Sequence, residues 1–245
     1  MPIKFMQLFQ DSWNFMRNQH QFSVFAIGAM LFIQLCQFVI LQFFPMELSV
    51  NGGNPEGMLS VIIPTVVLLI LTLLFTALII LNIKSVTNGS YKHFFQPVTK
   101  IVNSFFPLVI LNIISAIPLA FTINAVASFA INGKSSISLV ALPIVAMGFY
   151  LFAKLCLTTY VYLIEEPQKS VTETLSFTFR LSKGKMRPLI LFCLLSSFLP
   201  LFIINSLERL GNGSFILILS AIISAFIGVF VIVFSFRFYQ LYRQL

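Results

Sequence analysis

The chain has 245 residues, of which 58% are hydrophobic and only 9% are charged, and its mean hydropathy is +0.98. A soluble domain carries roughly 25% charged residues, so this chain has too few polar side chains to cover a water-exposed surface, and lipid must solvate much of it. The net charge of +8 does not indicate nucleic-acid binding, because the basic residues lie between apolar segments, where anionic lipid headgroups are the nearer partner.

Six apolar segments are long enough to cross a bilayer as helices, which takes about 20 residues for each helix. Short connections rich in Gly, Asn and Pro join these segments in pairs, as expected for three helical hairpins. The sequence therefore predicts an all-α integral membrane fold in which residues 1–245 form a single polytopic domain. The predicted spans are residues 22–44, 58–83, 105–131, 137–163, 188–207 and 214–236.

Lys and Arg residues are distributed unequally between the two sides of the predicted spans. Twelve of the 15 lie near the chain termini or in the second and fourth connections, whereas only Lys134 and Arg209 lie on the opposite side. The cytoplasmic loops of membrane proteins carry such an excess of positive charge. We therefore expect both termini to lie in the cytoplasm.

Each predicted hairpin follows a cytoplasmic segment with the pattern of an amphipathic helix. These segments precede the first, third and fifth spans, and Pro97 is expected to kink or restart the second of them. Residues 103–115 and 184–196 have similar sequences, with Pro107 and Pro188 near the start of a span. The pattern predicts three parallel repeats of amphipathic helix, span, outer turn and span.

The segment 170–183 carries the most complete set of helix signals. Ser170 and Glu173 have the spacing of a capping box, and Gly184 is placed to end the helix. Its apolar face, which we expect to contact the membrane interface or the bundle, contains Val171 and Leu175 together with Phe179. Four basic residues at or after its end are candidate contacts for anionic headgroups or a protein partner: Arg180, Lys183, Lys185 and Arg187.

One basic residue, Lys154, lies well inside a predicted span. Its ammonium group either reaches toward the cytoplasm or faces the bundle, where it would need oxygen partners. Glu165 would share its helix face if the fourth helix continued that far. Asn112 and Asn82, in the third and second spans, complete a candidate intramembrane polar site around Lys154.

The sequence lacks the motifs of common catalytic, nucleotide-binding and metal sites. His20 and His93 are separated by a whole hairpin, and the three Cys residues lie within spans, where they suit packing. We therefore predict that the protein is not an enzyme and that it has no metal site and no cofactor.

Three short motifs resemble those of a known family. They are Asn14-Phe15-Met16-Arg17-Asn18-Gln19, Phe179-Arg180-Leu181-Ser182 followed by Met186-Arg187, and Phe236-Arg237-Phe238-Tyr239. They are similar to motifs of the uncharacterised YciC-like inner-membrane proteins of Gram-negative bacteria. The resemblance implies a bacterial inner-membrane location and a multi-pass helical fold, and it implies no reaction.

Two functional classes are compatible with these observations. The first is a non-enzymatic protein of envelope or membrane organisation, which acts through lipids, a membrane protein partner or self-association. The second is a small-solute transporter, channel or transport accessory with a polar site around Lys154. A water-filled polar cavity converging on Lys154 would favour the second class.

Overall fold

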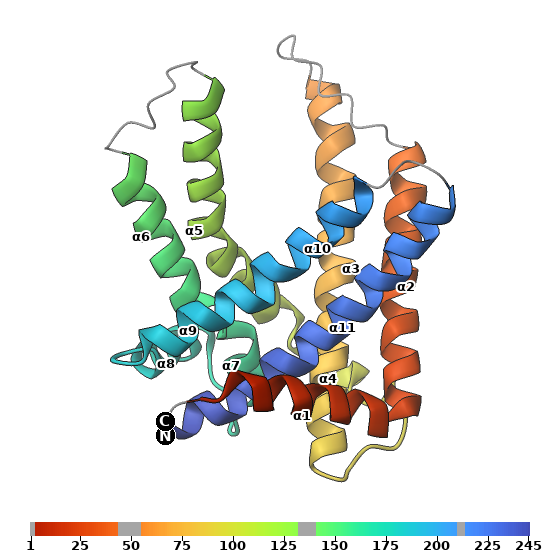
Figure 1. Ribbon diagram of the computed structural model, residues 1–245, viewed down its shortest axis with the longest axis vertical. Coiled ribbons are helices and arrows are strands. Elements are labelled where there is room, and N and C mark those ends of the chain that lie inside the picture. The colour runs from red at the N-terminus through yellow and green to blue at the C-terminus, as the bar shows by residue number, and fades with distance from the viewer. Residues whose placement is uncertain (1–2, 44–54, 132–140, 210–213) are drawn as a thin grey trace. The chain divides into compact units, whose positions relative to one another are not determined.

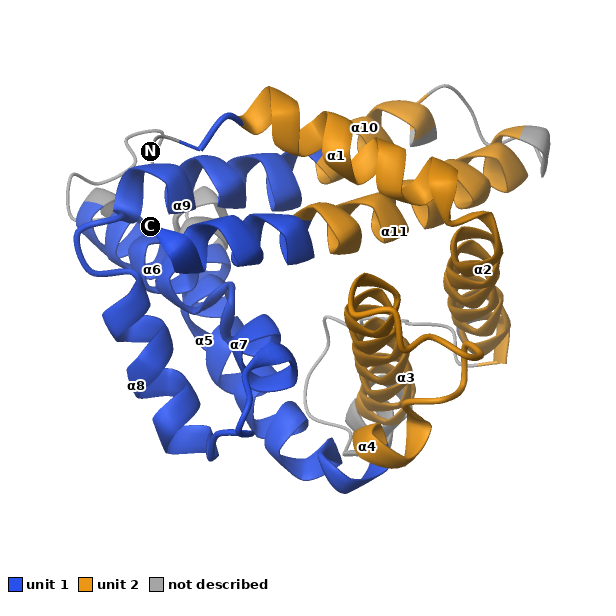
Figure 2. Ribbon diagram, turned by 90° about the horizontal axis from the view of Figure 1, so that it is seen from below, with its two compact units in different colours: residues 1–4, 102–199, 235–245 blue, residues 5–101, 200–234 orange. Residues whose placement is uncertain are grey.

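A computed structural model describes residues 3–43, 55–131, 141–209 and 214–245, and the regular elements in these ranges are helices (Figure 1). The all-α prediction is therefore confirmed for the described residues. The chain divides into two compact units (Figure 2). Unit 1 contains Met1–Lys4, Val102–Leu199 and Ser235–Leu245, and unit 2 contains Phe5–Ile101 and Pro200–Phe234. The grouping into units does not test the predicted single membrane domain, which stays a prediction.

The helices of unit 2 come from both ends of its sequence. They are α1 (Phe5–Asn18), α2 (His20–Phe43), α3 (Pro55–Thr87), α10 (Leu199–Glu208) and the first part of α11 (Ser214–Gln244). Unit 1 contains α5 (Phe105–Ile131), α6 (Ala141–Leu155), α7 (Thr158–Ile164), α8 (Val171–Leu181), α9 (Met186–Cys193) and the end of α11. The short helix α4 (Val98–Asn103) lies at the boundary in sequence between the two units.

Within the residues that the structure describes, six stretches of helix are long and apolar enough to cross a membrane, as the sequence predicts. Their order follows that of the predicted spans, and the prediction of six candidate membrane helices is confirmed. The assignment rests on helix length and composition alone. Six such helices suggest a multi-pass membrane protein. The stretches are His20–Ile40, Ile62–Thr87, Phe105–Asn124, Pro143–Ile164, Met186–Leu207 and Ile216–Gln244.

Two of these stretches are not regular α-helices. In the fourth, α6 ends at Leu155 and α7 begins at Thr158, whose Oγ1 donates to the carbonyl of Leu155 over 2.6 Å. In the fifth, a π-helical turn (Leu194–Phe198) lies between α9 and α10. Pro200 lies two residues after the end of this turn. Proline lacks an N–H and crowds the preceding turn of helix, and the wider π-helical turn relieves that crowding.

A short helix precedes each of the first, third and fifth stretches. These helices are α1, α4 and α8, as the predicted repeat requires, although α4 has only six residues. Residues 91–97 before it are turn or irregular structure, and the regular helix begins directly after Pro97. Proline restricts the residue before it and has no N–H to donate, so the helical pattern predicted for this connection starts only at Val98.

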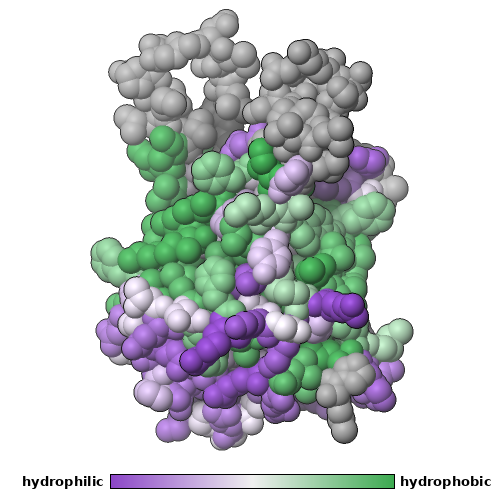
Figure 3. Space-filling view, turned by 90° about the vertical axis from the view of Figure 1, so that its left-hand side faces the viewer, coloured by the Kyte–Doolittle hydropathy of each residue, from purple (hydrophilic) through white to green (hydrophobic). Residues whose placement is uncertain are grey.

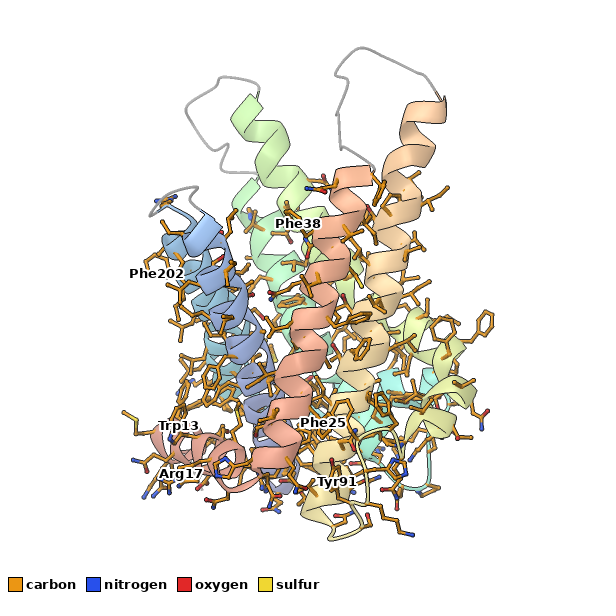
Figure 4. All side chains as sticks on the ribbon, turned by 90° about the vertical axis from the view of Figure 1, so that its right-hand side faces the viewer. Trp13, Arg17, Phe25, Phe38, Tyr91 and Phe202 are labelled. Carbon is orange, nitrogen blue, oxygen red and sulfur yellow. The ribbon has the colours of Figure 1, made fainter. Side chains whose placement is uncertain are left out.

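In unit 2, aromatic side chains pack α1 against α11. Phe9 stacks on Phe230, with ring centroids 5.8 Å apart, and its ring lies tilted against that of Phe234 at 4.7 Å. Trp13 meets Phe226 edge-on at 5.9 Å. The α11 partners recur every four residues and therefore lie on one face of the helix. Figure 4 shows Trp13, Arg17 and Tyr91 at one end of this unit, whereas Phe38 and Phe202 lie farther along it.

In unit 1, α8 packs on α5, α6 and α7, and its buried side chains include a row of hydroxyl groups. Thr174, Thr178 and Ser182 are buried, and each donates to a backbone carbonyl about one turn earlier over 2.8 to 2.9 Å. These small, internally satisfied side chains allow close helix approach. Phe179, which the sequence places on the face toward the membrane interface or the bundle, is exposed.

Candidate functional site

The chain between α7 and α8 begins with a buried carboxylate. Glu165 caps the C-terminal end of α7, and its side chain is only 3% exposed. The hydroxyl of Tyr239 donates a hydrogen bond to Oε1 of Glu165, and Nη2 of Arg243 lies 2.9 Å from Oε2. Tyr239 and Arg243 are one turn apart on α11, so both reach the same carboxylate from one helix face.

The Arg243 side chain, unlike that of Glu165, is 55% exposed and reaches solvent. The ion pair therefore joins a buried anion to a hydrated cation, while Tyr239 supplies a second donor from the protein interior. A buried carboxylate needs such partners, because an unpaired charge in the interior is strongly unfavourable. Both carboxylate oxygens are engaged by α11. Because α6 ends at Leu155 and α7 begins at Thr158, the helix does not continue unbroken from Lys154 to Glu165, which was the condition for the two to share a face.

The same connection is held at two further points. Nε2 of Gln168 donates to Oγ of Ser104 over 3.0 Å. Ser170 and Glu173 form the predicted capping box: the Ser170 N–H donates to Oε2 of Glu173 over 2.9 Å, and the Glu173 N–H donates to Oγ of Ser170 over 3.3 Å. The capping box is thus confirmed, and Gly184, with φ of +78°, follows the end of α8 as predicted.

We expect Ser170→Ala to destabilise α8 by about 1 kcal/mol, because it removes the acceptor of the Glu173 N–H. The measurement is hydrogen exchange of the first turn of α8 in detergent. Thr172→Ala, which leaves the two capping-box hydrogen bonds intact, is the control. Equal protection in the two variants would contradict the prediction.

The hydrogen bond from the backbone N–H of Ser170 lowers the pKa of Glu173, with help from the Ser170 side chain and nearby Lys169. The carboxylate therefore supports the cap above the ordinary Glu pKa, and this support is lost as the pH falls through the lowered value. We expect protection of the first turn of α8 to fall with the pH in the natural protein and to be independent of it in Glu173→Gln. If protection of this turn in the natural protein did not change with the pH, this role of Glu173 would be excluded.

A groove of about 680 Å³ opens between the connection and the first turns of α8. Phe177 contributes an aromatic ring to its lining, and two cations lie over this ring: Nζ of Lys169 at 5.0 Å and the guanidinium carbon of Arg180 at 5.8 Å from the centroid. Thr172 and Ser176 contribute hydroxyl groups, and Glu173 contributes one carboxylate. The groove therefore combines two positive charges with one negative charge.

The four basic residues predicted as lipid or partner contacts follow one another around the end of α8 and the start of α9. Arg180, Lys183 and Arg187 are exposed, and Lys185 is half-buried. The carbonyl of Lys185 accepts a hydrogen bond from the Tyr242 hydroxyl over 3.1 Å. The face in Figure 3 shows hydrophilic residues gathered at its lower end and hydrophobic residues above them.

Stacked rings hold the end of α9 against the end of α11. The centroids of Phe192 and Phe238 are 4.1 Å apart, with nearly parallel planes, and Phe238 stacks on Tyr242 at 5.2 Å. All three rings are buried. The segment that carries Lys185 and Arg187 is therefore supported by a packed aromatic column and not only by the connecting chain.

The residues of the predicted intramembrane polar site belong to two units: Lys154 and Asn112 to unit 1, and Asn82 to unit 2. Nζ of Lys154 lies 4.8 Å from the Tyr150 ring centroid and 5.5 Å from that of Phe179 on α8. Asn112 is half-buried on α5. Asn82 belongs to unit 2, where it is fully buried and its Nδ2 donates to the carbonyls of Leu78 and Phe94 over 2.8 Å and 2.7 Å. A shared site for these three residues stays a prediction.

The contact of Glu165 with Tyr239 and Arg243 is absent from the sequence predictions. One available signal was the pair Glu165-Glu166 at the end of an apolar span. The other was the spacing of Tyr239 and Arg243, which places both on one face of the last helix. Neither signal identifies the partner, because the contact joins residues 74 positions apart.

Comparisons with known proteins give one informative similarity. The chain is 26% identical over 250 residues to an uncharacterised protein of Haemophilus influenzae (strain ATCC 51907 / DSM 11121 / KW20 / Rd), and the alignment covers 99% of each chain. No protein-family model matches the chain, and no solved structure matches it. The similarity supports a relationship to an uncharacterised family.

Proposed function

We propose that this chain is a multi-pass inner-membrane protein of the YciC-like type, built from three hairpins that each follow a cytoplasmic amphipathic helix. The order of α1, α4 and α8 before the first, third and fifth apolar stretches supports the repeat. The position of Trp13, Arg17 and Tyr91 at one end of unit 2 suits a membrane boundary, where aromatic and basic residues are enriched (Figure 4). Both termini then lie in the cytoplasm.

Its proposed role is non-enzymatic: it contributes to membrane organisation by binding anionic lipid headgroups. The observation that carries this role is the exposed basic surface formed by Arg180, Lys183 and Arg187, which leads directly into the fifth apolar stretch. Each basic residue beside an anionic membrane surface contributes about 1 kcal/mol of attraction. A membrane protein partner with acidic residues would use the same charges.

The test removes three charges at constant helix content. We expect Arg180→Gln/Lys183→Gln/Arg187→Gln to retain much less anionic lipid after purification than the natural protein, because the exposed charges at the α8–α9 junction are lost. The control is Lys4→Gln/Arg17→Gln/Lys92→Gln, which removes the same number of charges from exposed positions elsewhere. Lipid mass spectrometry gives the amount bound.

A topology reporter separates lipid binding from an effect on insertion. A reporter that is active only outside the cytoplasm should be silent after Leu245 and active after Asn132 in both triple variants. Unchanged lipid retention in the Arg180→Gln/Lys183→Gln/Arg187→Gln variant would refute the binding role. The reverse reporter pattern would refute the orientation.

Transport remains the second candidate, and one observation favours it: the fourth apolar stretch is interrupted between α6 and α7, close in sequence to Lys154. Broken helices often accompany transport sites. The geometry gives greater support to lipid binding, because the Lys154 ammonium lies over the rings of Tyr150 and Phe179. Its contact with Phe179 on α8 suits a side chain that extends toward the predicted cytoplasmic helix.

A further inference from the structure

We propose that the groove at the start of α8 is a binding site for a phosphate ester group, with Lys169 and Arg180 as its two cationic contacts. This inference rests on the proposed headgroup-binding role and deepens it by assigning a specific site. Lys169 lies before α8 and outside the predicted basic surface. The chemistry is that of a phospholipid headgroup, and a soluble phosphate ester shares it.

The first argument is electrostatic. Lys169 and Arg180 lie over the same Phe177 ring, so two like charges border one groove. Like charges repel, and the one carboxylate of the groove, Glu173, already accepts the N–H of Ser170. A bound phosphate would neutralise the remaining charge and accept hydrogen bonds from both cations, which makes it the ligand that the groove fits.

The second argument concerns the helix positions. Thr172, Ser176 and Arg180 recur every four residues and therefore form one column along α8. Ser176 is exposed and lines the groove with Thr172, so two hydroxyl groups lie on the same helix face as the guanidinium. Hydroxyl and guanidinium donors together suit the several acceptor oxygens of a phosphate ester.

The third argument is rigidity. The wall of the groove is the connection from Glu165 to Ser170, which is held by the contacts of Glu165 with α11, by the bond from Gln168 to Ser104 and by the capping box. A site held by such supporting contacts loses less entropy on binding than a flexible loop. These contacts distinguish the groove from the exposed surface near Lys183.

The volume of the groove favours a lipid headgroup over bare phosphate. About 680 Å³ falls within the range of small-molecule sites, and the groove is open on one side. A headgroup could therefore place its phosphate between Lys169 and Arg180 while its acyl chains leave through the open side. Apolar surface is available nearby, because Phe179 is exposed on the same helix.

The experiment measures binding of short-chain phosphatidylglycerol to the full-length protein in a neutral detergent at physiological salt. These conditions remove the general membrane surface potential and weaken exposed charge contacts. We expect Lys169→Gln and Arg180→Gln each to weaken binding about tenfold, which corresponds to about 1.4 kcal/mol. The matched control, Lys92→Gln, removes one exposed charge outside both the groove and the basic surface. It should bind within about twofold of the natural protein, since isolated surface charges contribute little.

A competition arm identifies the source of the phosphate. Glycerol 3-phosphate is added as a competitor. If it displaces the lipid at a concentration similar to that of the lipid, the groove binds a soluble ester. If even an excess fails to displace the lipid, the groove binds the lipid headgroup. The inference is overturned if Lys169→Gln binds both ligands as the natural protein does. If Arg180→Gln/Lys183→Gln/Arg187→Gln still retains less lipid than the natural protein in that case, the groove is not the binding site but the headgroup-binding role stands. If that variant also retains lipid, the headgroup-binding role fails as well.

Discussion

Glu165→Ala is expected to destabilise the folded protein by about 3 kcal/mol. The substitution leaves the buried Tyr239 hydroxyl without its acceptor and removes the anion that Arg243 pairs with. Breaking a buried ion pair typically costs about 3 to 5 kcal/mol. The lower end of that range applies, because the Arg243 side chain is 55% exposed and water can replace part of its lost contact. Thermal unfolding of the purified protein in detergent measures the loss.

A double-mutant cycle tests whether the loss comes from the contact itself. Tyr239→Phe should cost about 1 to 3 kcal/mol in the natural background, because it removes a donor to a buried carboxylate. In a Glu165→Leu background the same change should have little effect, since no carboxylate remains. Additive losses would show that Glu165 and Tyr239 act independently and would contradict the pairing.

The six apolar stretches could be predicted from the sequence because bilayer thickness sets a simple requirement of length and hydropathy. The capping box at Ser170 could also be predicted, because both of its partners lie within one helical turn. These features depend on residues that are close in sequence. They could be predicted because they follow from local physical rules and do not require knowledge of the tertiary fold.

The partner of Glu165 could not be predicted by the same reasoning. Lys154 and Glu165 could share a helix face only in one continuous fourth helix, whereas α6 ends at Leu155 and α7 begins at Thr158. After such a break the angular relation between Lys154 and Glu165 is lost. The true partners, Tyr239 and Arg243, lie on α11 and are brought to Glu165 only by tertiary packing.

The buried face of α8 was missed for a different reason. The predicted apolar face of α8 contained Val171, Leu175 and Phe179 and did not include Thr174 or Thr178. The structure buries the threonines and leaves Phe179 exposed beside Lys154. Each threonine hydroxyl donates to a backbone carbonyl of its own helix, so burial leaves no unsatisfied donor. Hydropathy alone does not include this local compensation.

Gly148→Ala is expected to destabilise the packing of α5 against α6 by up to about 3 kcal/mol. A Cβ atom at residue 148 would overlap Oγ1 of Thr122 and lie 3.0 Å from the carbonyl oxygen of Pro118. Thr122 is buried, and its hydroxyl donates to that same carbonyl over 2.8 Å, so the side chain has little freedom to move away. Overpacking a tight contact typically costs about 1 to 3 kcal/mol.

The controls use glycines at which an added Cβ meets open space. Gly28→Ala and Gly228→Ala lie in helices α2 and α11, with no atom within 4 Å of the new Cβ, and they should be neutral or slightly stabilising because Ala favours helix. Thr122→Ala combined with Gly148→Ala should recover part of the stability, since it removes the nearest obstacle, the Thr122 hydroxyl, and leaves the Pro118 carbonyl and the Cβ atom of residue 122. Thermal unfolding in detergent compares all four variants. A Gly148→Ala protein as stable as the two controls would show that α5 and α6 are not in close contact at this residue.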